Sequence, residues 1–294
     1  MLSKLRYDAS ESQLNAPRQE ELAEGLAALF GTELADLMPL PGGTLGICFK
    51  AKLRGQLRFF KTHAIPSGRS ALRREVAFLD AVAQEAADPH LLETGDAACP
   101  RVWLHTKLLE PGAPPSPTQI SRLIVRYEAG LKEHPCLGRD VPVEDNIHHL
   151  LAQAEEALYV LSKEGFLSVF VRDAAAAGIE RLKPVLAALP LQLCHGDLGP
   201  ANIMSSGDEL VALDWEDVFW GVAGYDYLYW MTFFGNRKWL SQYALGNTIL
   251  DRSSDISLMV VILLLKSLLS VRNGHHIHNS LSIDDRLLEV INLG

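Results

Sequence analysis

The sequence predicts an α+β fold with two lobes, a smaller N-terminal lobe built on an antiparallel sheet and a larger C-terminal lobe that is mostly helical. Short strand-like runs alternate with turns up to residue 109. A segment rich in proline follows at residues 111–118, and long stretches of helix-forming residues dominate the rest of the chain. We therefore expect an N-terminal lobe of residues 1–109 and a C-terminal lobe of residues 110–294.

The N-terminal lobe opens with an amphipathic helix and two strands. Apolar residues recur with helical spacing over Arg18–Phe30, and Gly31 ends the helix. Two strand-like runs, Ile47–Leu53 and Leu57–Lys61, are separated by a turn at residues 54–55. Neighbouring runs joined by so short a turn pair as antiparallel strands, so they form the start of the sheet.

A helix and a further strand complete this lobe. Residues 70–83 place their apolar side chains on one face, with Ser70 as the N-cap of the helix. The apolar run Val102–Leu109 predicts a strand that ends at Glu110. The prolines of residues 111–118 then predict a break in regular structure, because proline lacks the backbone N–H and has a fixed φ.

The larger lobe is predicted from its composition. Val143–Gly165 and Ala174–Leu189 are rich in Ala, Leu, Glu and Lys and contain few Gly or Pro residues, which is typical of helices. Two short β-like runs, Leu191–Cys194 and Leu210–Asp214, interrupt the helical pattern. Helices are expected again from Tyr225 to the end of the chain.

The strongest chemical signal is a polar segment that begins at His195 and contains Asp197 and Asn202, followed by an apolar strand that ends at Asp214. Phosphoryl transfer from ATP needs a carboxylate that orients and deprotonates the attacking hydroxyl. It also needs oxygen ligands for Mg²⁺, usually carboxylates and an amide. Asp197 is therefore the predicted catalytic base, and Asn202 and Asp214 are the predicted metal ligands. Each residue alone would be interpreted as a turn cap or a strand-end acid, but the combination favours catalysis.

This segment resembles the aminoglycoside phosphotransferase and choline kinase-like family, whose catalytic loop has the pattern HGDxxxxN and whose metal loop has the pattern DxE or DxD. The His, Gly, Asp and Asn of this chain stand at the family spacing, and Asp214 and Glu216 match the DxE form. The resemblance implies a protein kinase-like fold with the nucleotide between the lobes. It also implies that Asp197 is the base, that Asn202 and Asp214 bind Mg²⁺, that His195 braces the loop and that Glu216 supports the metal site.

The N-terminal lobe offers a lysine and a glutamate for a nucleotide site. Lys61 ends an apolar strand, and Glu75 faces inward on the next helix if its apolar neighbours do. A buried lysine needs a partner, and such a pair can aim the ammonium at the phosphates of ATP. This pair resembles the strand lysine and helix glutamate of the kinase fold. The alternatives are an exposed Lys61 on an edge strand and a Glu75 paired with Arg73 or Arg74.

Two backbone segments complete the predicted nucleotide site. Gly42, Gly43 and Gly46 would form a hairpin that covers the phosphates, because glycine lets backbone N–H groups approach an anion closely. A plain hairpin turn explains these glycines about as well. The resemblance implies that residues 108–110, ending at Glu110, link the lobes and meet the adenine edge with backbone groups.

The charge and cysteine content limit the partners and the location. The chain has 27 Lys and Arg against 36 Asp and Glu, a net charge of -9, which argues against nucleic-acid and membrane-surface binding. We expect a small-molecule hydroxyl acceptor, and the net charge favours a cationic or amine-bearing one. The 4 cysteines lack the spacing of a metal site, and no secretory pattern opens the chain, so we expect a cytoplasmic protein. Ile256–Val271 is shorter than a membrane span and is predicted to be a buried helix.

Two alternatives stay open at this level. Aromatic residues cluster at residues 215–230, where they fill the core or form a cage for a quaternary ammonium, and the core is the favoured interpretation. The complete set of carboxylates favours an enzyme. The alternative is a catalytically inactive kinase-like module that binds a nucleotide or acts as a scaffold.

Overall fold

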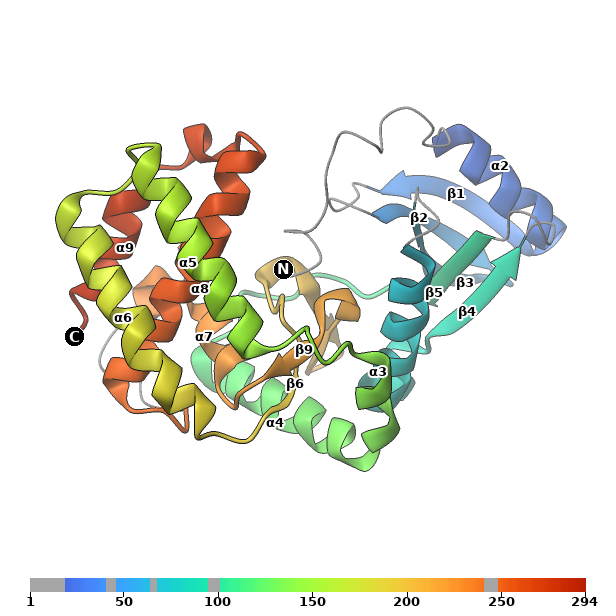
Figure 1. The fold of residues 1–294 in the computed structure, drawn as a ribbon. Helices are drawn as coiled ribbons and strands as arrows, with labels where there is room; N and C mark the ends of the chain where they lie inside the picture. Colours follow the sequence, from blue (N-terminus) through green and yellow to red (C-terminus); the bar gives the residue numbers. More distant parts are fainter. Residues whose placement is uncertain (1–18, 41–45, 64–67, 95–100, 241–247) are drawn as a thin grey trace.

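A sheet-based lobe and a helical lobe stand side by side in the computed structural model (Figure 1). The structure describes residues 19–40, 46–63, 68–94, 101–240 and 248–294. Five antiparallel strands form one sheet in the N-terminal lobe, and most of the helices lie after residue 110. The predicted α+β fold with two lobes is therefore confirmed. The exact boundary between residues 109 and 110 stays a prediction.

The N-terminal sheet has the strand order β1-β2-β3-β5-β4. Its strands are β1 (Leu34–Leu40), β2 (Gly46–Leu53), β3 (Gln56–His63), β4 (His90–Thr94) and β5 (Arg101–Lys107). Successive side chains of a strand point to opposite faces of the sheet. In β3, Phe60 therefore enters the small core that the sheet forms with Leu22 and Leu26 of helix α2 (Gln19–Phe30), while Lys61 faces helix α3.

Three sequence predictions for this lobe were incomplete or wrong. Strands β1 and β4 were not predicted. In β1, Asp36 at positive φ and a register shift between Ala35 and Met38 break the alternation by which a strand is recognised. Helix α3 runs over Arg69–Ala87, so its N-cap is Gly68 and not Ser70. A Cβ at Gly68 would lie 2.3 Å from Cγ of His63, so Gly68 packs directly against the end of β3.

The proline-rich linker ends in a helix instead of excluding one. Helix α4 (Pro117–Glu133) begins within the segment where we expected no regular structure. Ser116 and Gln119 form a capping box, since the backbone N–H of each is bonded by the side chain of the other. Proline is favourable at the first helical position because the N–H it lacks would have no partner within the helix.

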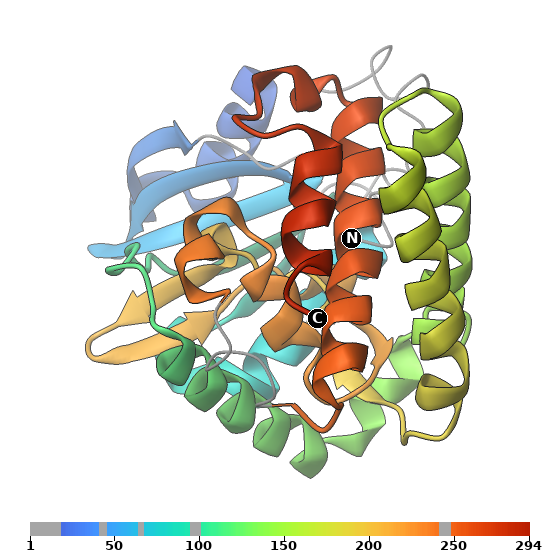
Figure 2. The same ribbon diagram turned by 90° about the vertical axis from the view of Figure 1, so that its left-hand side faces the viewer.

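The C-terminal lobe is a group of packed helices. They are α5 (Ile147–Lys163), α6 (Val169–Ala187), α7 (Tyr225–Met231), α8 (Arg252–Arg272) and α9 (Ile283–Ile291). Helix α8 packs against the other four, and Figure 2 shows it with α9 beside α5 and α6.

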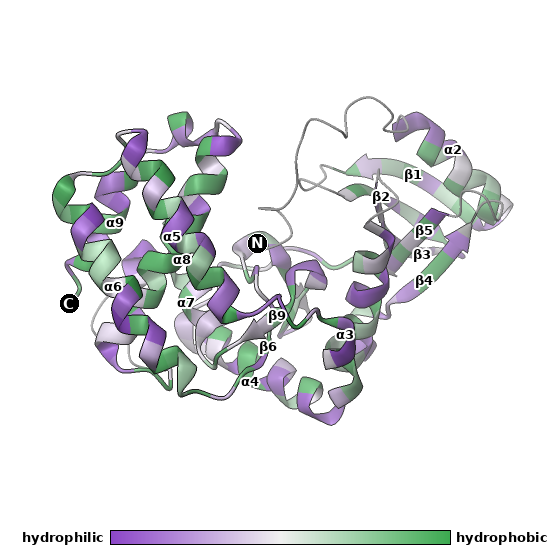
Figure 3. Ribbon diagram, in the orientation of Figure 1, coloured by the Kyte–Doolittle hydropathy of each residue, from purple (hydrophilic) through white to green (hydrophobic). Residues whose placement is uncertain are grey.

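Helix α8 is the helix that we predicted over Ile256–Val271. Among the described residues, it alone is long and apolar enough to cross a membrane by length and composition. Hydrophobic residues run along it (Figure 3), and its residues 254–265 are all buried inside the lobe. The prediction of a buried helix is confirmed.

Two small hairpin-like sheets bring the predicted loops together. Strand β6 (Gln192–Cys194) pairs with β9 (Phe219–Gly221), and β7 (Ile203–Ser206) pairs with β8 (Glu209–Ala212). The segment between β6 and β7 is the catalytic loop, residues 195–202, and the segment between β8 and β9 contains the metal loop, residues 213–217. The two outer strands of this segment, β6 and β9, pair with each other, and so do the two inner strands, β7 and β8. The loops that connect outer to inner strands therefore emerge side by side.

Candidate active site

Direct hydrogen bonds connect the catalytic loop to the metal loop. The backbone N–H of Leu213 donates to the carbonyl of Asn202 at 2.8 Å. Nε2 of His195 lies 2.9 Å from the carbonyl oxygen of Leu213, and since a carbonyl only accepts, this nitrogen is the donor. The buried His195 ring also packs on Trp215, with 4.5 Å between ring centroids. These contacts agree with the bracing role that the resemblance implied for His195.

Asp226 of α7 holds the first turn of the catalytic loop. Its carboxylate accepts hydrogen bonds from the backbone N–H of His195 at 2.8 Å and of Gly196 at 3.0 Å, and from the hydroxyl of Tyr127 at 2.6 Å. Gly196 has a φ of +83°, and a Cβ there would lie 2.1 Å from the carbonyl oxygen of Asp217. The turn therefore requires glycine. Sequence reasoning missed Asp226, although an acid inside a buried aromatic helix signals that backbone donors surround it.

Asp197 is partly buried, and donors hold both its side chain and its backbone. The hydroxyl of Tyr229 donates to Oδ1 of Asp197 at 2.5 Å. Nδ2 of Asn202 donates to the backbone carbonyl of Asp197 at 2.8 Å. The pKa of Tyr229 is raised well above its usual range, mainly by burial and next by the negative charge of Asp197. The phenol therefore keeps the proton that it donates. The carboxylate is thus present as an acceptor in a fixed loop.

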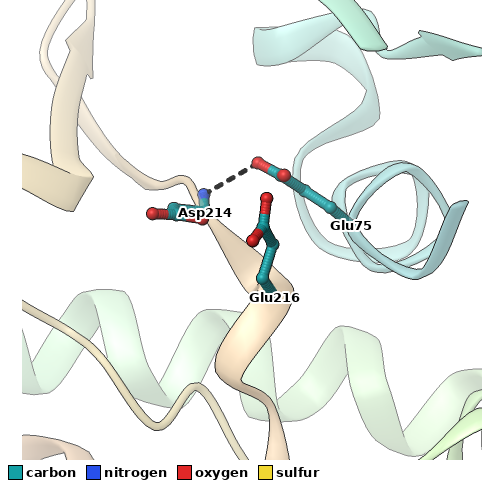
Figure 4. A group of neighbouring side chains, drawn as sticks. All are labelled: Glu75, Asp214 and Glu216. Atoms are coloured by element: carbon teal, nitrogen blue, oxygen red, sulfur yellow. Dashed lines mark hydrogen bonds between the residues drawn. The ribbon is translucent and has the colours of Figure 1, made fainter. Parts of the chain in front are cut away.

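Asp214 stands where the metal loop leaves β8, in an unusual backbone conformation. Its φ is 66°, a left-handed value that costs a residue with a Cβ about 1–2 kcal/mol. The backbone N–H of Asp214 donates to Oε1 of Glu75 at 3.2 Å (Figure 4). This bond joins the metal loop to α3 of the other lobe and helps to hold the strained residue.

Lys61 lies at the centre of a cluster of carboxylates from both lobes. Its Nζ is 2.9 Å from Oε2 of Glu75, 2.8 Å from Oδ1 of Asp214 and 2.7 Å from Oε1 of Glu216. Nε2 of His63 contacts the same oxygen of Glu216 at 2.8 Å. The lysine is 7% exposed, so the predicted partnership of a buried Lys61 with Glu75 agrees with the geometry.

Lys61 faces more negative than positive charge, since its partners Glu75, Asp214 and Glu216 are all acids. Burial alone would lower the pKa of Lys61, but the charges of Glu75, Asp214 and Glu216 outweigh burial and raise it. Burial raises the pKa of Glu75 to about 8. Burial would also raise the pKa of Glu216, but the hydrogen bond from His63 and the charge of Lys61 lower it. Three acidic side chains thus share one ammonium, and the raised pKa of Glu75 shows that burial opposes full ionisation of all three.

The donor atoms of this region fit a magnesium ion. Glu75, Asp214 and Glu216 each offer an oxygen, and these oxygens lie within 4.8 Å of one another. Asn202 uses its Nδ2 to bond Asp197, which leaves its Oδ1 as the amide atom for a metal. Carboxylate and amide oxygens are the ligands that Mg²⁺ prefers, and excess negative charge favours a divalent cation.

The remaining predicted nucleotide-site residues lie around Lys61 or outside the described residues. Gly46 begins β2 beside Lys61, and a Cβ there would lie 3.1 Å from Cε of the lysine. Gly42 and Gly43 lie outside the described residues. The carbonyl of Glu110 accepts a hydrogen bond from the N–H of Ser205 at 2.9 Å, so this oxygen ties the linker to β7.

The structure decides two alternatives that the sequence left open. Arg73 pairs with Glu93 at 2.6 Å, so it is not the partner of Glu75. The aromatic cluster after Asp214 belongs to the core: Trp215, Tyr225 and Trp230 are 0% exposed. A cage for a quaternary ammonium requires exposed rings, which these three residues do not offer.

Comparison with known families identifies the chain. The model of the phosphotransferase enzyme family matches residues 52–248, which include Lys61 and both loops. The chain belongs to this family. A search of curated proteins finds no match.

Solved phosphotransferase structures share the fold of the whole chain. A thermostable variant of the aminoglycoside phosphotransferase APH(4)-Ia, in complex with AMP-PNP and hygromycin B, has a TM-score of 0.57 at 12% identity and covers 93% of this chain and 98% of its own. The spectinomycin phosphotransferase APH(9)-Ia, in complex with ADP and spectinomycin, has a TM-score of 0.61 at 13% identity, with 93% and 92% covered. A choline/ethanolamine kinase family protein from Mesorhizobium loti has a TM-score of 0.56 at 19% identity, with 93% and 94% covered. The predicted protein kinase-like fold of the phosphotransferase enzyme family is therefore confirmed.

Proposed function

We propose that this member of the phosphotransferase enzyme family transfers the γ-phosphoryl group of ATP to a hydroxyl group of a small molecule. The observation that carries the proposal is the meeting of Lys61 and Glu75 with Asp214, beside a loop that presents Asp197. A lysine for phosphates, acids for a metal and a carboxylate for a hydroxyl are the groups that phosphoryl transfer needs. Related structures are complexes with AMP-PNP and ADP, which supports ATP as the donor.

The proposed reaction assigns one proton transfer to Asp197. Its carboxylate accepts the proton of the acceptor hydroxyl, while the acceptor oxygen forms a bond to the γ-phosphorus of ATP. The bond between that phosphorus and the β–γ bridging oxygen breaks, and ADP leaves with the negative charge. The contacts of Lys61 with Glu75 and Asp214 orient its ammonium between the lobes, and in the proposed reaction this ammonium binds the phosphates of ATP.

Asn202 and Asp214 are the residues that would hold Mg²⁺, with Glu216 as a further acid nearby. When bound, the ion supplies positive charge that neutralises the phosphate oxygens of ATP. Nζ of Lys61 lies 2.8 Å from Oδ1 of Asp214, so the lysine and the ion would share the same acids. The protein's own contribution is to keep these acids at one point between the lobes.

The class of the acceptor is the least constrained part of the proposal. Hygromycin B and spectinomycin appear with related enzymes, which supports a small polyhydroxylated acceptor. The net charge of -9 still favours a cationic one. Two acids of the helical lobe do not add to this argument, since Glu155 pairs with Lys183 and Glu156 with Arg272.

A panel of acceptors tests the proposal. Purified protein, ATP and Mg²⁺ are incubated with aminoglycosides, choline, ethanolamine, neutral sugars and anionic alcohols, and ADP release and the phosphorylated product are measured. We expect acceptor-dependent ADP release, greatest with an amine-bearing acceptor. ADP release at the same background rate with every acceptor would favour the catalytically inactive alternative. A neutral or anionic best acceptor would remove the charge argument and leave the kinase assignment intact.

A further inference from the structure

Tyr229 bonds the carboxylate that the proposed reaction uses. Its hydroxyl is 2.5 Å from Oδ1 of Asp197, and the tyrosine is 3% exposed. A carboxylate only accepts, so the phenol donates. A hydrogen bond of this length from a hydroxyl to a charged oxygen is stronger than a hydrogen bond between two neutral groups. The torsion that rotates an aspartate carboxylate has a broad preference, so a donor of this kind determines its orientation.

Lys266 of α8 and Phe233, which lies four residues further along the chain, both contact the ring of Tyr229. Nζ of Lys266 lies 3.7 Å from the centroid of the Tyr229 ring and donates to Oγ1 of Thr232 at 2.7 Å. The ring of Phe233 lies 5.6 Å from that of Tyr229 in an edge-on arrangement. Phe233 also covers the catalytic loop, because a Cβ on Gly199 would lie 2.7 Å from its Cζ. The phenol is therefore fixed between the loop and the core.

We propose that Tyr229 is a positioning residue for Asp197: by donating to Oδ1, it sets the orientation of the carboxylate that receives the proton of the acceptor hydroxyl. This inference rests on the proposed function. Orienting a reacting group contributes to rate because the transition state then requires no further ordering of that group. Tyr229 itself touches neither the acceptor nor ATP in this assignment and acts through Asp197.

Tyr225 provides a matched control on the same helix. It lies four residues earlier, its ring is 6.0 Å from that of Tyr229, and it is fully buried. Its hydroxyl has no hydrogen-bond partner within the part of the chain that the structure describes. Tyr225→Phe and Tyr229→Phe therefore remove the same atom from neighbouring places, but only the second removes a bond to Asp197.

The first experiment measures steady-state ATP turnover with Mg²⁺ and the best acceptor of the panel, or with water. We expect Tyr229→Phe to lower kcat about tenfold and to change the KM for ATP less than twofold, with Tyr225→Phe close to wild type. In an Asp197→Asn background, Tyr229→Phe should cause no further loss, because its effect passes through that carboxylate. An unchanged kcat in Tyr229→Phe, with Asp197→Asn inactive, would overturn the inference and leave the proposed function standing.

The second experiment needs no acceptor. Urea unfolding is measured for Tyr229→Phe and Tyr225→Phe in the wild-type and Asp197→Ala backgrounds. We expect Tyr229→Phe to reduce the folding equilibrium constant at least fivefold more in the wild-type background than in Asp197→Ala, and Tyr225→Phe to act equally in both. Equal effects of Tyr229→Phe would overturn the inference whatever the activity. A larger effect of Tyr229→Phe in the wild-type background, found in a protein that turns over no ATP, would support the interaction of Tyr229 with Asp197 and count against the proposed function.

Discussion

The base region and the lysine cluster are built in opposite ways. Asp197 is held by Tyr229, by Asn202 and, through its loop, by Asp226, all of them residues of the C-terminal lobe. Lys61 instead comes from the N-terminal sheet and meets acids that include Asp214 of the other lobe. The base is therefore organised inside one packed lobe, whereas the cluster exists only where two lobes meet.

The two regions also differ in how their charges are compensated. Asp226 receives three hydrogen bonds from backbone and tyrosine donors, which satisfies a buried carboxylate without a cation. In the lysine cluster, three carboxylates face one ammonium and the histidine at position 63. A fully satisfied network is rigid, while an unbalanced one has affinity left for a ligand. Fixed geometry suits the predicted role of Asp197 as base, and uncompensated acids suit the predicted role of the lysine cluster in ligand binding.

The largest expected effect comes from replacing Asp197, the predicted catalytic base. Asp197→Asn keeps the shape of the side chain but cannot accept a proton, so we expect kcat to fall roughly 10²–10⁴-fold with a small change in the KM for ATP. Initial rates of acceptor phosphorylation measure both constants. A variant that retains most of its kcat would show that another group is the base.

A second effect tests whether the catalytic loop is as rigid as the contacts indicate. Gly196→Ala places a Cβ 2.1 Å from the carbonyl oxygen of Asp217 at a positive φ, so we expect it to lower the free energy of unfolding by roughly 2–4 kcal/mol. Gly207→Ala is the control, with a φ of +62° and no described heavy atom within 4 Å, and should cost about 1–2 kcal/mol. Urea denaturation measures both losses. Equal losses would mean that the loop yields easily around Gly196.

A third effect tests the lysine cluster through its cation. Lys61→Ala removes charge-assisted contacts to phosphate, and we expect the KM for ATP to rise about 10–100-fold. Lys52→Ala is the matched control, because Lys52 lies on β2, is exposed and pairs with Asp36 at 2.7 Å. It should change the KM less than about twofold. Similar effects of both substitutions would show that Lys61 is not the nucleotide-binding lysine.

The smallest effect sharpens the assignment of the metal ligands. We expect excess chelator to weaken ATP binding about tenfold relative to Mg²⁺, since the phosphates then face uncompensated acids. Asp214→Ala should abolish this difference, whereas Asp208→Ala, in the exposed turn after β7, should preserve it. Isothermal calorimetry measures the six affinities, those of the three proteins with Mg²⁺ and with chelator. Equal affinities of the wild type with and without Mg²⁺ would contradict the metal assignment.

Much of the site could be predicted because its signals are local. His195, Asp197 and Asn202 lie within eight residues, so their spacing alone indicates a loop with one purpose. The predicted contact between Lys61 and Glu75 needed only a strand followed by a helix with one inward face. Local signals were also overlooked: the serine, proline and glutamine that begin α4 form a recognisable helix start.

The sequence by itself determined the type of fold and the candidates for the reacting groups, because periodicity, glycine placement and short motifs act between residues that are close along the chain. Only the tertiary structure decided that Asp226 and Tyr229, which lie about thirty residues after the catalytic loop, hold its backbone and its carboxylate. The tertiary structure also decided that most of the aromatic residues after Asp214 are buried, and that the acids of the metal loop reach Lys61 across the lobes. Such contacts depend on how helices and sheets pack, and packing brings together residues whose separation along the chain carries no signal of their proximity.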